Sequence, residues 1–313
     1  MSIAEPAVEQ FPHPALAYLA ATRPPFILAT IVPVILGLSY SVYQGYTLDW
    51  ATAVLSLLAA VLLHAGINVL NDYYDALNGT DDNNDERIFP FTGGSRFIQN
   101  EVMTRQQTLI YGVCLMLAVM LIGSYLVAQT GAALFWLGLT GIVIGWGYSA
   151  PPLRLNSRGL GELCVLAGFS LLPLGAWLVQ TGNLSTNVVA IAIPVGLLTA
   201  NLLFINQFPD RKADIQAGKL HWVARLEPDT ARWGYVLIAS LAWLMLAMLI
   251  AVGLLPVSAL VAMLPAVLTY RAAAILIRHA NHPSALVPAI RMTILAMLAH
   301  GALLSAVLIV ESL

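Results

Sequence analysis

Carboxylate and amide side chains gather in two short segments of the chain. The first segment comprises Asn68, Asn71, Asp72 and Asp75. The second comprises Asn206, Asp210 and Asp214. Residues three or four positions apart lie on the same side of a helix, so each segment places its acidic side chains on one helical face. Residues 71–75 and 206–210 also match as a weak internal repeat, at an offset of 135 residues.

Carboxylates packed on one face repel one another unless a cation neutralises them. Hard divalent cations prefer oxygen ligands, and Mg²⁺ in proteins combines a few carboxylates with the oxygens of a substrate phosphate. The Arg and Lys side chains that follow both segments suit the remaining phosphate oxygens. The two segments therefore predict a Mg²⁺–diphosphate site. The simpler alternative is a pair of solvated acidic helix ends.

The elements that carry these segments are predicted to be membrane-spanning helices. Hydrophobic residues make up 59% of the 313 residues and charged residues 10%, whereas a soluble domain has about 25% charged residues. This composition excludes a water-soluble enzyme, and a net charge of −2 leaves no basic footprint for nucleic acid. Stretches free of Asp, Glu, Lys and Arg run over 24–48, 50–71, 106–153, 163–209, 233–270 and 292–310.

The lengths of these stretches predict the number of spans. A spanning helix needs roughly 20 apolar residues, so the three longest stretches each have room for two helices. Turn residues lie near the middle of each, at Gly131, Gly182 and Gly253. We therefore predict an all-α polytopic membrane protein with nine transmembrane helices. Residues 1–22 are expected to form an N-terminal interfacial segment with a short helix from Pro14 to Thr22, and residues 23–313 a single transmembrane domain.

The charges also predict an orientation. In a nine-span bundle all 14 Lys and Arg residues fall in, or at the edges of, the loops on one side. Of the 16 acidic residues, only Asp49 and Glu311 fall on the other side. The positive-inside rule places the N-terminus and both acidic segments in the cytoplasm. We expect an integral protein of the inner (cytoplasmic) membrane of a bacterium, with its active site facing the cytoplasm.

The two acidic segments resemble the two aspartate motifs of the UbiA superfamily, the intramembrane prenyltransferases, whose members have nine transmembrane helices. The matching residues are Asn71-Asp72-x-x-Asp75, Asp210-x-x-x-Asp214, Arg23-Pro24 and Tyr148-Ser149-Ala150-Pro151-Pro152. A finer pattern is similar to the dihydroxynaphthoate polyprenyltransferases of menaquinone synthesis. That pattern comprises Asn68, Gly79 and Asp81, then Thr92-Gly93-Gly94-Ser95, and Gly218-Lys219. Trp222 and Glu227 depart from it, so the aromatic acceptor stays open.

The resemblance implies transfer of a polyprenyl group from polyprenyl diphosphate to an aromatic quinone precursor. The expected catalytic residues are Asp72, Asp75, Asp210 and Asp214. The expected Mg²⁺ ligands are Asn71, Asp72, Asp75, Asp81, Asn206, Asp210 and Asp214. The expected substrate-binding residues are Arg23, Asn68, Arg96, Tyr148, Arg154, Lys219 and Arg225. Together the metal and the cations would take up the charge on the departing diphosphate.

Two alternatives to this function stay open. The resemblance implies 1,4-dihydroxy-2-naphthoate as the acceptor, prenylated with loss of CO₂, and 4-hydroxybenzoate is the alternative acceptor. A secondary transporter is an alternative of another class. It would hold its binding residues near the bilayer midplane, whereas these residues lie at helix ends on one side.

Several smaller features carry expectations of their own. The segment 76–105 is far longer than the median connection of about 4–6 residues, and we expect it to be a lid whose Arg96 reaches the diphosphate. Its acidic run 82–86 is expected to be a solvated loop. Cys114 and Cys164 lie in apolar runs and are expected to be buried. Gly141 and Gly145 are expected to mark close helix packing.

Overall fold

A computed structural model of the chain describes residues 4–82 and 84–313. Over these residues the chain is helical without strands, which confirms the all-α class. Nine of the described helices are long and apolar enough to cross a membrane, as predicted. They are α2 (Pro24–Tyr43), α3 (Trp50–Asn78), α4 (Arg105–Thr130), α5 (Ala132–Ser149), α6 (Gly161–Thr181), α7 (Thr186–Gln216), α9 (Pro228–Ala251), α10 (Ala266–His279) with η3 (Val257–Met263) before it, and α11 (Val287–Val310) with η4 (Pro283–Leu286) before it. The chain is an integral membrane protein.

The helices end where the turn residues predict. Gly131 (φ 106°) and Gly182 (φ 71°) adopt positive φ at the ends of α4 and α6, a backbone region that favours glycine. At the start of α3, the Asp49 carboxylate accepts the backbone N–H groups of Ala51 (2.9 Å) and Thr52 (3.2 Å). These local signals divide the long apolar stretches into separate helices.

Two helices extend beyond their apolar stretches. The stretches that predict α3 and α7 stop at residues 71 and 209, but the helices continue to Asn78 and Gln216. Gly79, at φ 78°, ends α3. Hydropathy marks only the part of a helix that meets lipid, and the polar turns that follow remain helical. Both acidic motifs therefore lie on rigid helical turns at the ends of these two helices.

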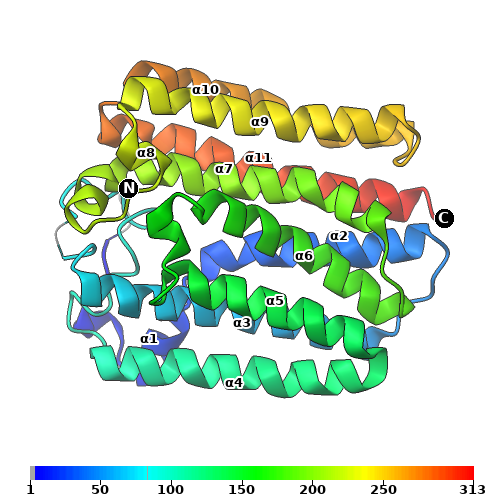
Figure 1. Cartoon of the computed structure of the whole chain (residues 1–313), viewed down its shortest axis with the longest axis horizontal. Helices are drawn as coiled ribbons and strands as arrows, with labels where there is room; N and C mark the ends of the chain where they lie inside the picture. Colours follow the sequence, from blue (N-terminus) through cyan, green and yellow to red (C-terminus); the bar gives the residue numbers. More distant parts are fainter. Residues whose placement is uncertain (1–3, 83) are drawn as a thin grey trace.

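The helices run side by side, with α9 and α10 along one edge of the bundle and α4 along the other (Figure 1). Small residues allow some of them to approach closely. A Cβ added to Gly37 of α2 would lie 2.3 Å from the backbone oxygen of Pro173 in α6. A Cβ at Gly145 of α5 would lie 2.3 Å from Ile67 Cδ1 of α3, which confirms close packing there. The expectation for Gly141 was wrong, because no neighbour lies within 4 Å of its added Cβ among the described residues.

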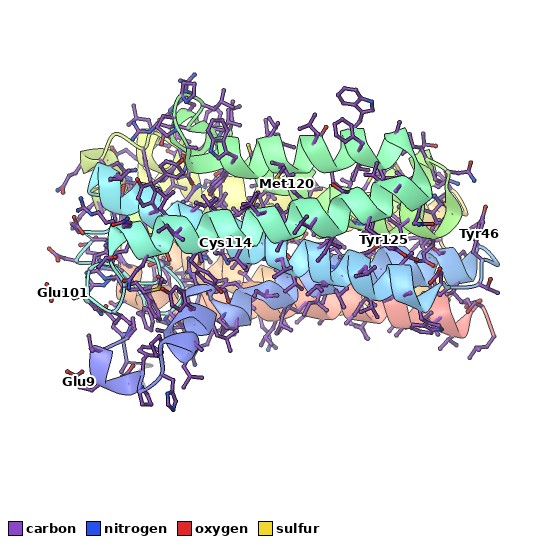
Figure 2. The ribbon with its side chains drawn as sticks, turned by 90° about the horizontal axis from the view of Figure 1, so that it is seen from below. Glu9, Tyr46, Glu101, Cys114, Met120 and Tyr125 are labelled. Atoms are coloured by element: carbon purple, nitrogen blue, oxygen red, sulfur yellow. The ribbon has the colours of Figure 1, made fainter. Side chains whose placement is uncertain are left out.

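A long loop and two short helices lie at one end of the bundle. The loop 79–104, α8 (Trp222–Arg225) and α1 (Pro14–Ala21) lie there, and the C-terminus lies at the other end (Figure 1). Figure 2 shows Glu9 and Glu101 at this end and Tyr46 at the opposite one. The α1 helix is the short helix expected from Pro14, and it follows η1 (Val8–Gln10). Its place at a membrane interface stays a prediction.

The expectation for the first cysteine was wrong. Cys114 is exposed, and it lies along the outer surface of α4 with Met120 and Tyr125 (Figure 2). Apolar surroundings in the sequence do not predict burial in a membrane protein, because lipid-facing positions are apolar too. Cys164 is half-buried and faces the cavity described below.

Candidate active site

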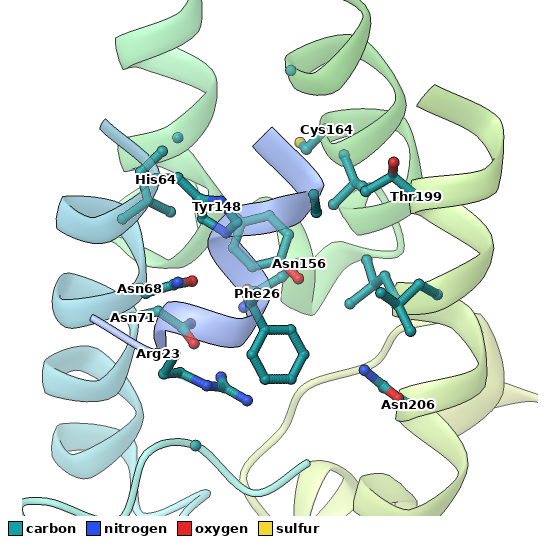
Figure 3. Close-up of a pocket in the computed structure, with 18 of the residues that line it drawn as sticks. Arg23, Phe26, His64, Asn68, Asn71, Tyr148, Asn156, Cys164, Thr199 and Asn206 are labelled. Atoms are coloured by element: carbon teal, nitrogen blue, oxygen red, sulfur yellow. The ribbon is translucent and has the colours of Figure 1, made fainter. Parts of the chain in front are cut away.

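A cavity of about 330 Å³ lies within the bundle, beside both acidic motifs. Its walls come from α2, α3, α5, α6, α7 and the loop 79–104. Apolar side chains, among them Ile67, Phe169 and Leu202, line one part of it, and the acidic motifs line the other. Asn71 of α3 and Asn206 of α7 lie on opposite walls, with Phe26 and Tyr148 between them (Figure 3). The cavity thus joins an apolar compartment to a strongly polar one.

The first motif is held by hydrogen bonds at the end of α3. Asn71 Nδ2 donates to Ser149 Oγ (2.6 Å), which leaves the amide oxygen as the atom available to a cation. Asn68 Nδ2 donates to the backbone oxygen of Thr22 (3.1 Å). Asp72 is 5% exposed and does not line the cavity; its Oδ1 accepts the backbone N–H of Ser95 (3.2 Å). The structure thus places Asp72 against the loop 79–104.

The second motif is held by groups from outside α7. Asp210 Oδ1 accepts from Asn84 Nδ2 (2.6 Å), and its Oδ2 accepts the backbone N–H of Gly93 (3.4 Å). Asp214 Oδ2 lies 2.9 Å from Nε2 of His221. Both carboxylates line the cavity.

Lys219 joins the two motifs. Its Nζ lies 2.8 Å from Asp75 Oδ1 and 3.7 Å from Asp214 Oδ1. Burial opposes the charge on this amine, but the carboxylates of Asp75 and Asp214 outweigh that effect and raise the pKa of Lys219 well above its usual value. Lys219 is therefore charged at neutral pH and neutralises part of the acidic cluster.

The loop 79–104 closes over this polar compartment. Asp81 and Asn84, 3% and 1% exposed, face the cavity, so the run 82–86 is not wholly a solvated loop; Asn83 lies outside the described residues. Burial and the carboxylates of Asp75 and Asp72 raise the pKa of Asp81 well above its usual value. A Cβ at Gly94 (φ 71°) would lie 2.5 Å from Asp81 Oδ2, so this position has room only for glycine. The acidic groups and the loop are tightly packed together.

The donor set fits a hard divalent cation. Four oxygens that border the cavity are buried and have no hydrogen-bond partner among the described residues, namely Asp81 Oδ2, Asn84 Oδ1, Asn206 Oδ1 and Gln207 Oε1. Unpaired buried acceptors are costly, and a cation would satisfy them. No three His, Cys, Asp or Glu side chains of the described ranges gather closely enough to hold a metal alone. Amide oxygens and the phosphate oxygens of a substrate could complete the ligand set, and a cation would compete with the Lys219 amine for Asp75 and Asp214.

Of the five basic residues predicted to bind substrate, two line the cavity and three do not. Arg23 and Lys219 line the cavity. Arg23 Nη2 also donates to the backbone oxygens of Pro90 (3.3 Å) and Phe91 (3.4 Å), which ties the loop to the start of α2. The structure does not bring Arg96, Arg154 or Arg225 to the cavity wall.

Arg96 does not border the cavity and instead contacts the backbone of the loop. It is 8% exposed, donates through Nη1 to the backbone oxygen of Asp81, and lies 3.8 Å from Oε2 of Glu5. Burial, together with the neighbouring charge of Arg87, lowers its pKa from the usual value. Arg154 and Arg225 are exposed, and Arg225 Nη2 donates to the backbone oxygen of Arg158 (3.0 Å).

Four further side chains that line the cavity are Tyr148, His64, Asn84 and His221. Tyr148 lines the cavity, as does His64, whose Nδ1 is hydrogen-bonded to Thr30 Oγ1 (2.6 Å). Sequence reasoning missed Asn84 and His221. No local pattern singles out Asn84, whereas the position of His221 two residues after Lys219 was a usable signal.

Comparison with known proteins decides the family. The UbiA prenyltransferase family matches residues 30–306. The chain belongs to this family. It is a membrane-embedded prenyltransferase. Membership in this family argues against the alternative that the chain is a secondary transporter.

Curated relatives are 28–32% identical to the chain over the aligned residues. The 1,4-dihydroxy-2-naphthoate octaprenyltransferase of Escherichia coli is 31% identical over 69% of this chain and 70% of its own length. The 2-carboxy-1,4-naphthoquinone phytyltransferase of Synechocystis is 32% identical over 67% and 66%. The 1,4-dihydroxy-2-naphthoate octaprenyltransferase of Mycobacterium tuberculosis is 28% identical over 90% and 92%.

Solved structures share the UbiA fold. A digeranylgeranylglyceryl phosphate synthase superposes with a TM-score of 0.65 at 14% identity, over 95% of this chain and 99% of the other. A UbiA homolog from Archaeoglobus fulgidus, solved with GPP and Mg²⁺, superposes with a TM-score of 0.60 at 16% identity, over 93% and 99%. The bundle formed by the described residues therefore has the family's fold.

Proposed function

We propose that this chain transfers a polyprenyl group from polyprenyl diphosphate to 1,4-dihydroxy-2-naphthoate, in a Mg²⁺-dependent step of menaquinone synthesis. One observation carries the proposal. Two acidic motifs, on α3 and α7, line the polar part of a cavity whose other part is apolar. The polar part suits a diphosphate with its cation, and the apolar part suits a prenyl tail. The names of the curated relatives support the naphthoate acceptor.

The site residues would share the binding of cation and diphosphate. Asn71, Asp75, Asp81, Asn206, Asp210 and Asp214 offer oxygen ligands at the cavity, and Asp72 supports the loop behind them. The bound Mg²⁺ would supply positive charge that favours departure of the diphosphate. Arg23 and Lys219 are the cations placed to bind its remaining oxygens.

The reaction breaks the C1–O bond of the allylic diphosphate, and the electron pair leaves with the diphosphate. The ring carbon that bears the carboxylate attacks the allylic carbon. Loss of CO₂ returns the electron pair of the carboxyl bond to the ring and leaves the prenylated hydroquinone. The allylic cation must be kept from water. The packed loop 79–104 and the apolar side chains of α6 and α7 would exclude it.

We further propose that the site faces the cytoplasm from a bacterial inner membrane. Thirteen of the 14 Lys and Arg residues lie in the loops or near the helix ends of one side, and Arg271 lies about two turns inside α10 from that same end. The positive-inside rule assigns that side to the cytoplasm. The motifs, Arg23 and Lys219 belong to the same side. A C-terminal fusion to a reporter active only in the periplasm should therefore be active, and activity of a cytoplasm-only reporter would contradict this orientation.

Mass spectrometry of the products tests the acceptor. Purified protein with octaprenyl diphosphate and Mg²⁺ is offered 1,4-dihydroxy-2-naphthoate or 4-hydroxybenzoate. We expect the naphthoate to yield a prenylated product without its carboxyl group, together with one CO₂ per transfer. A prenylated product that retains the carboxylate, or transfer to 4-hydroxybenzoate alone, would contradict the proposal.

A further inference from the structure

His221 is a buried histidine that the reaction described above does not use. It lies at the N-terminal end of α8, borders the cavity and is 4% exposed. Both of its ring nitrogens have a partner. Nδ1 lies 3.1 Å from the backbone nitrogen of Ala224, and Nε2 lies 2.9 Å from Oδ2 of Asp214.

These two contacts define where the proton of the ring lies. The backbone N–H of Ala224 can only donate, so Nδ1 must accept and carries no proton. The proton of the imidazole is therefore on Nε2, and Nε2–H donates to the Asp214 carboxylate. The bond to Ala224 thus sets the tautomer of a ring whose other nitrogen holds an acidic motif residue.

The two oxygens of Asp214 consequently face different groups. Oδ2 is held by His221, whereas Oδ1 lies 3.7 Å from Lys219 Nζ, which also contacts Asp75. Rotation of the carboxylate would break the bond to His221. Asp214 therefore presents Oδ1, rather than Oδ2, toward the place where the two motifs meet.

We propose that His221 is a positioning residue, which orients Asp214 so that Oδ1 is presented to the divalent cation. The inference rests on the cation site proposed above. Partners that orient a metal-ligating side chain typically change metal affinity or activity by about 10–100-fold. The function of His221 would thus be exerted through Asp214 rather than on the substrate.

Two substitutions of His221 test the roles of its two ring nitrogens separately. His221→Asn retains an acceptor near the position of Nδ1, and Asn is a favoured residue at a helix N-terminus, but it has no donor at the position of Nε2. His221→Gln retains a donor near Nε2 and loses the acceptor near Nδ1. His13→Asn is the matched control, because His13 also precedes a helix but is exposed and makes no side-chain bond to it.

Manganese binding is the readout, measured on purified protein without substrate from the electron paramagnetic resonance signal of free Mn²⁺. Circular dichroism at the same temperature confirms that each variant is folded. We expect the Kd for Mn²⁺ to rise about 10-fold or more in His221→Asn, and to stay within about 3-fold of wild type in His221→Gln and His13→Asn. The Mg²⁺ concentration needed for half-maximal activity should follow the same order.

Wild-type affinity in His221→Asn would overturn the proposal and leave His221 as a helix cap alone. Equal loss of affinity in the Asn and Gln variants would overturn the donor role of Nε2. If His221→Gln does not fold, His221→Asn still decides, because only that variant must lose affinity. Loss of affinity in a folded His221→Gln would contradict the donor role of Nε2 even if His221→Asn does not fold. Absence of Mn²⁺ binding by the wild type would instead reject the cation site itself, which separates that failure from failure of the histidine's role.

Discussion

Asn84 and Asp210 are joined by a hydrogen bond of 2.6 Å between Nδ2 and Oδ1, although 126 residues separate them in the sequence. Asn84 belongs to the loop that follows α3, and Asp210 belongs to the motif on α7. The bond therefore fastens the covering loop to the second acidic motif. Gly93 adds a backbone N–H to the other oxygen of Asp210, at 3.4 Å. Asp210 therefore accepts hydrogen bonds from the loop on both of its carboxylate oxygens.

Substitution of Asn84 is the first prediction. Asn84→Ala removes the side-chain bond to Asp210 and an amide oxygen that borders the cavity. We expect a higher KM for prenyl diphosphate and a larger fraction of free prenol, because a looser loop admits water to the allylic cation. Steady-state kinetics and chromatography of prenol measure both. Asp82→Ala, at an exposed position of the same loop, is the control, and equal behaviour of the two variants would contradict the role of Asn84.

The acidic motifs give the second prediction. Asp210→Asn keeps the size of the side chain but removes its charge, and so weakens a proposed ligand of the cation. Loss of a partner that merely orients a ligand already costs about 10–100-fold. We therefore expect kcat/KM to fall by more than about 100-fold, with normal insertion into the membrane. Full activity of this variant, or of the wild type in EDTA, would refute the cation site.

Stability without metal is the third prediction. Lys219 is charged and buried between Asp75 and Asp214, so Lys219→Met leaves two buried carboxylates without their cation. Loss of one partner of a buried ion pair costs about 3–5 kcal/mol. We expect a lower Tm than wild type in EDTA, and a larger rise in Tm on addition of Mg²⁺, because the added ion neutralises the same carboxylates.

Lys212→Met provides the comparison for Lys219. The Lys212 side chain is 71% exposed in its pair with Glu86, and exposed pairs contribute about 0–1 kcal/mol. Its Tm in EDTA should match that of wild type. If Lys219→Met and Lys212→Met have the same Tm both with and without Mg²⁺, Lys219 does not neutralise the charge of the acidic cluster.

The spans and the motifs were predictable from the sequence for a physical reason. Lipid requires long apolar helices, and charge cannot be buried within them without compensation. The nine spans and the positions of Asp72, Asp75, Asp210 and Asp214 near two helix ends follow from that rule. Hydropathy alone did not predict that α3 and α7 continue beyond their apolar stretches, because polar helical turns and polar loops have similar composition. The spacing of three and four residues between the acidic side chains did predict helical turns there.

The loop 79–104 was the part that sequence reasoning described least well. Its cations were expected to reach the diphosphate, yet Arg96 donates to the backbone of Asp81 and lies near Glu5. Asn84 was expected to be solvated, yet it is buried against Asp210. The conformation of such a loop depends on contacts between residues far apart in the chain, and no periodicity in the loop encodes those contacts.

The fourth prediction concerns the length of the prenyl chain. Gly141 of α5 borders the cavity and has no neighbour, among the described residues, within 4 Å of an added Cβ. A Cβ there meets no neighbour, and because the position borders the cavity, a larger side chain would take up space proposed for the prenyl tail. Gly141→Leu should therefore lower kcat/KM for octaprenyl diphosphate much more than for geranyl diphosphate. Gly138→Leu is the control: Gly138 lies one turn earlier, is exposed, has similar open space and does not border the cavity. Both substitutions raise helix propensity equally, so a difference between them reports on the cavity. An unchanged ratio of long-chain to short-chain activity in Gly141→Leu would mean that the tail does not pass this part of α5.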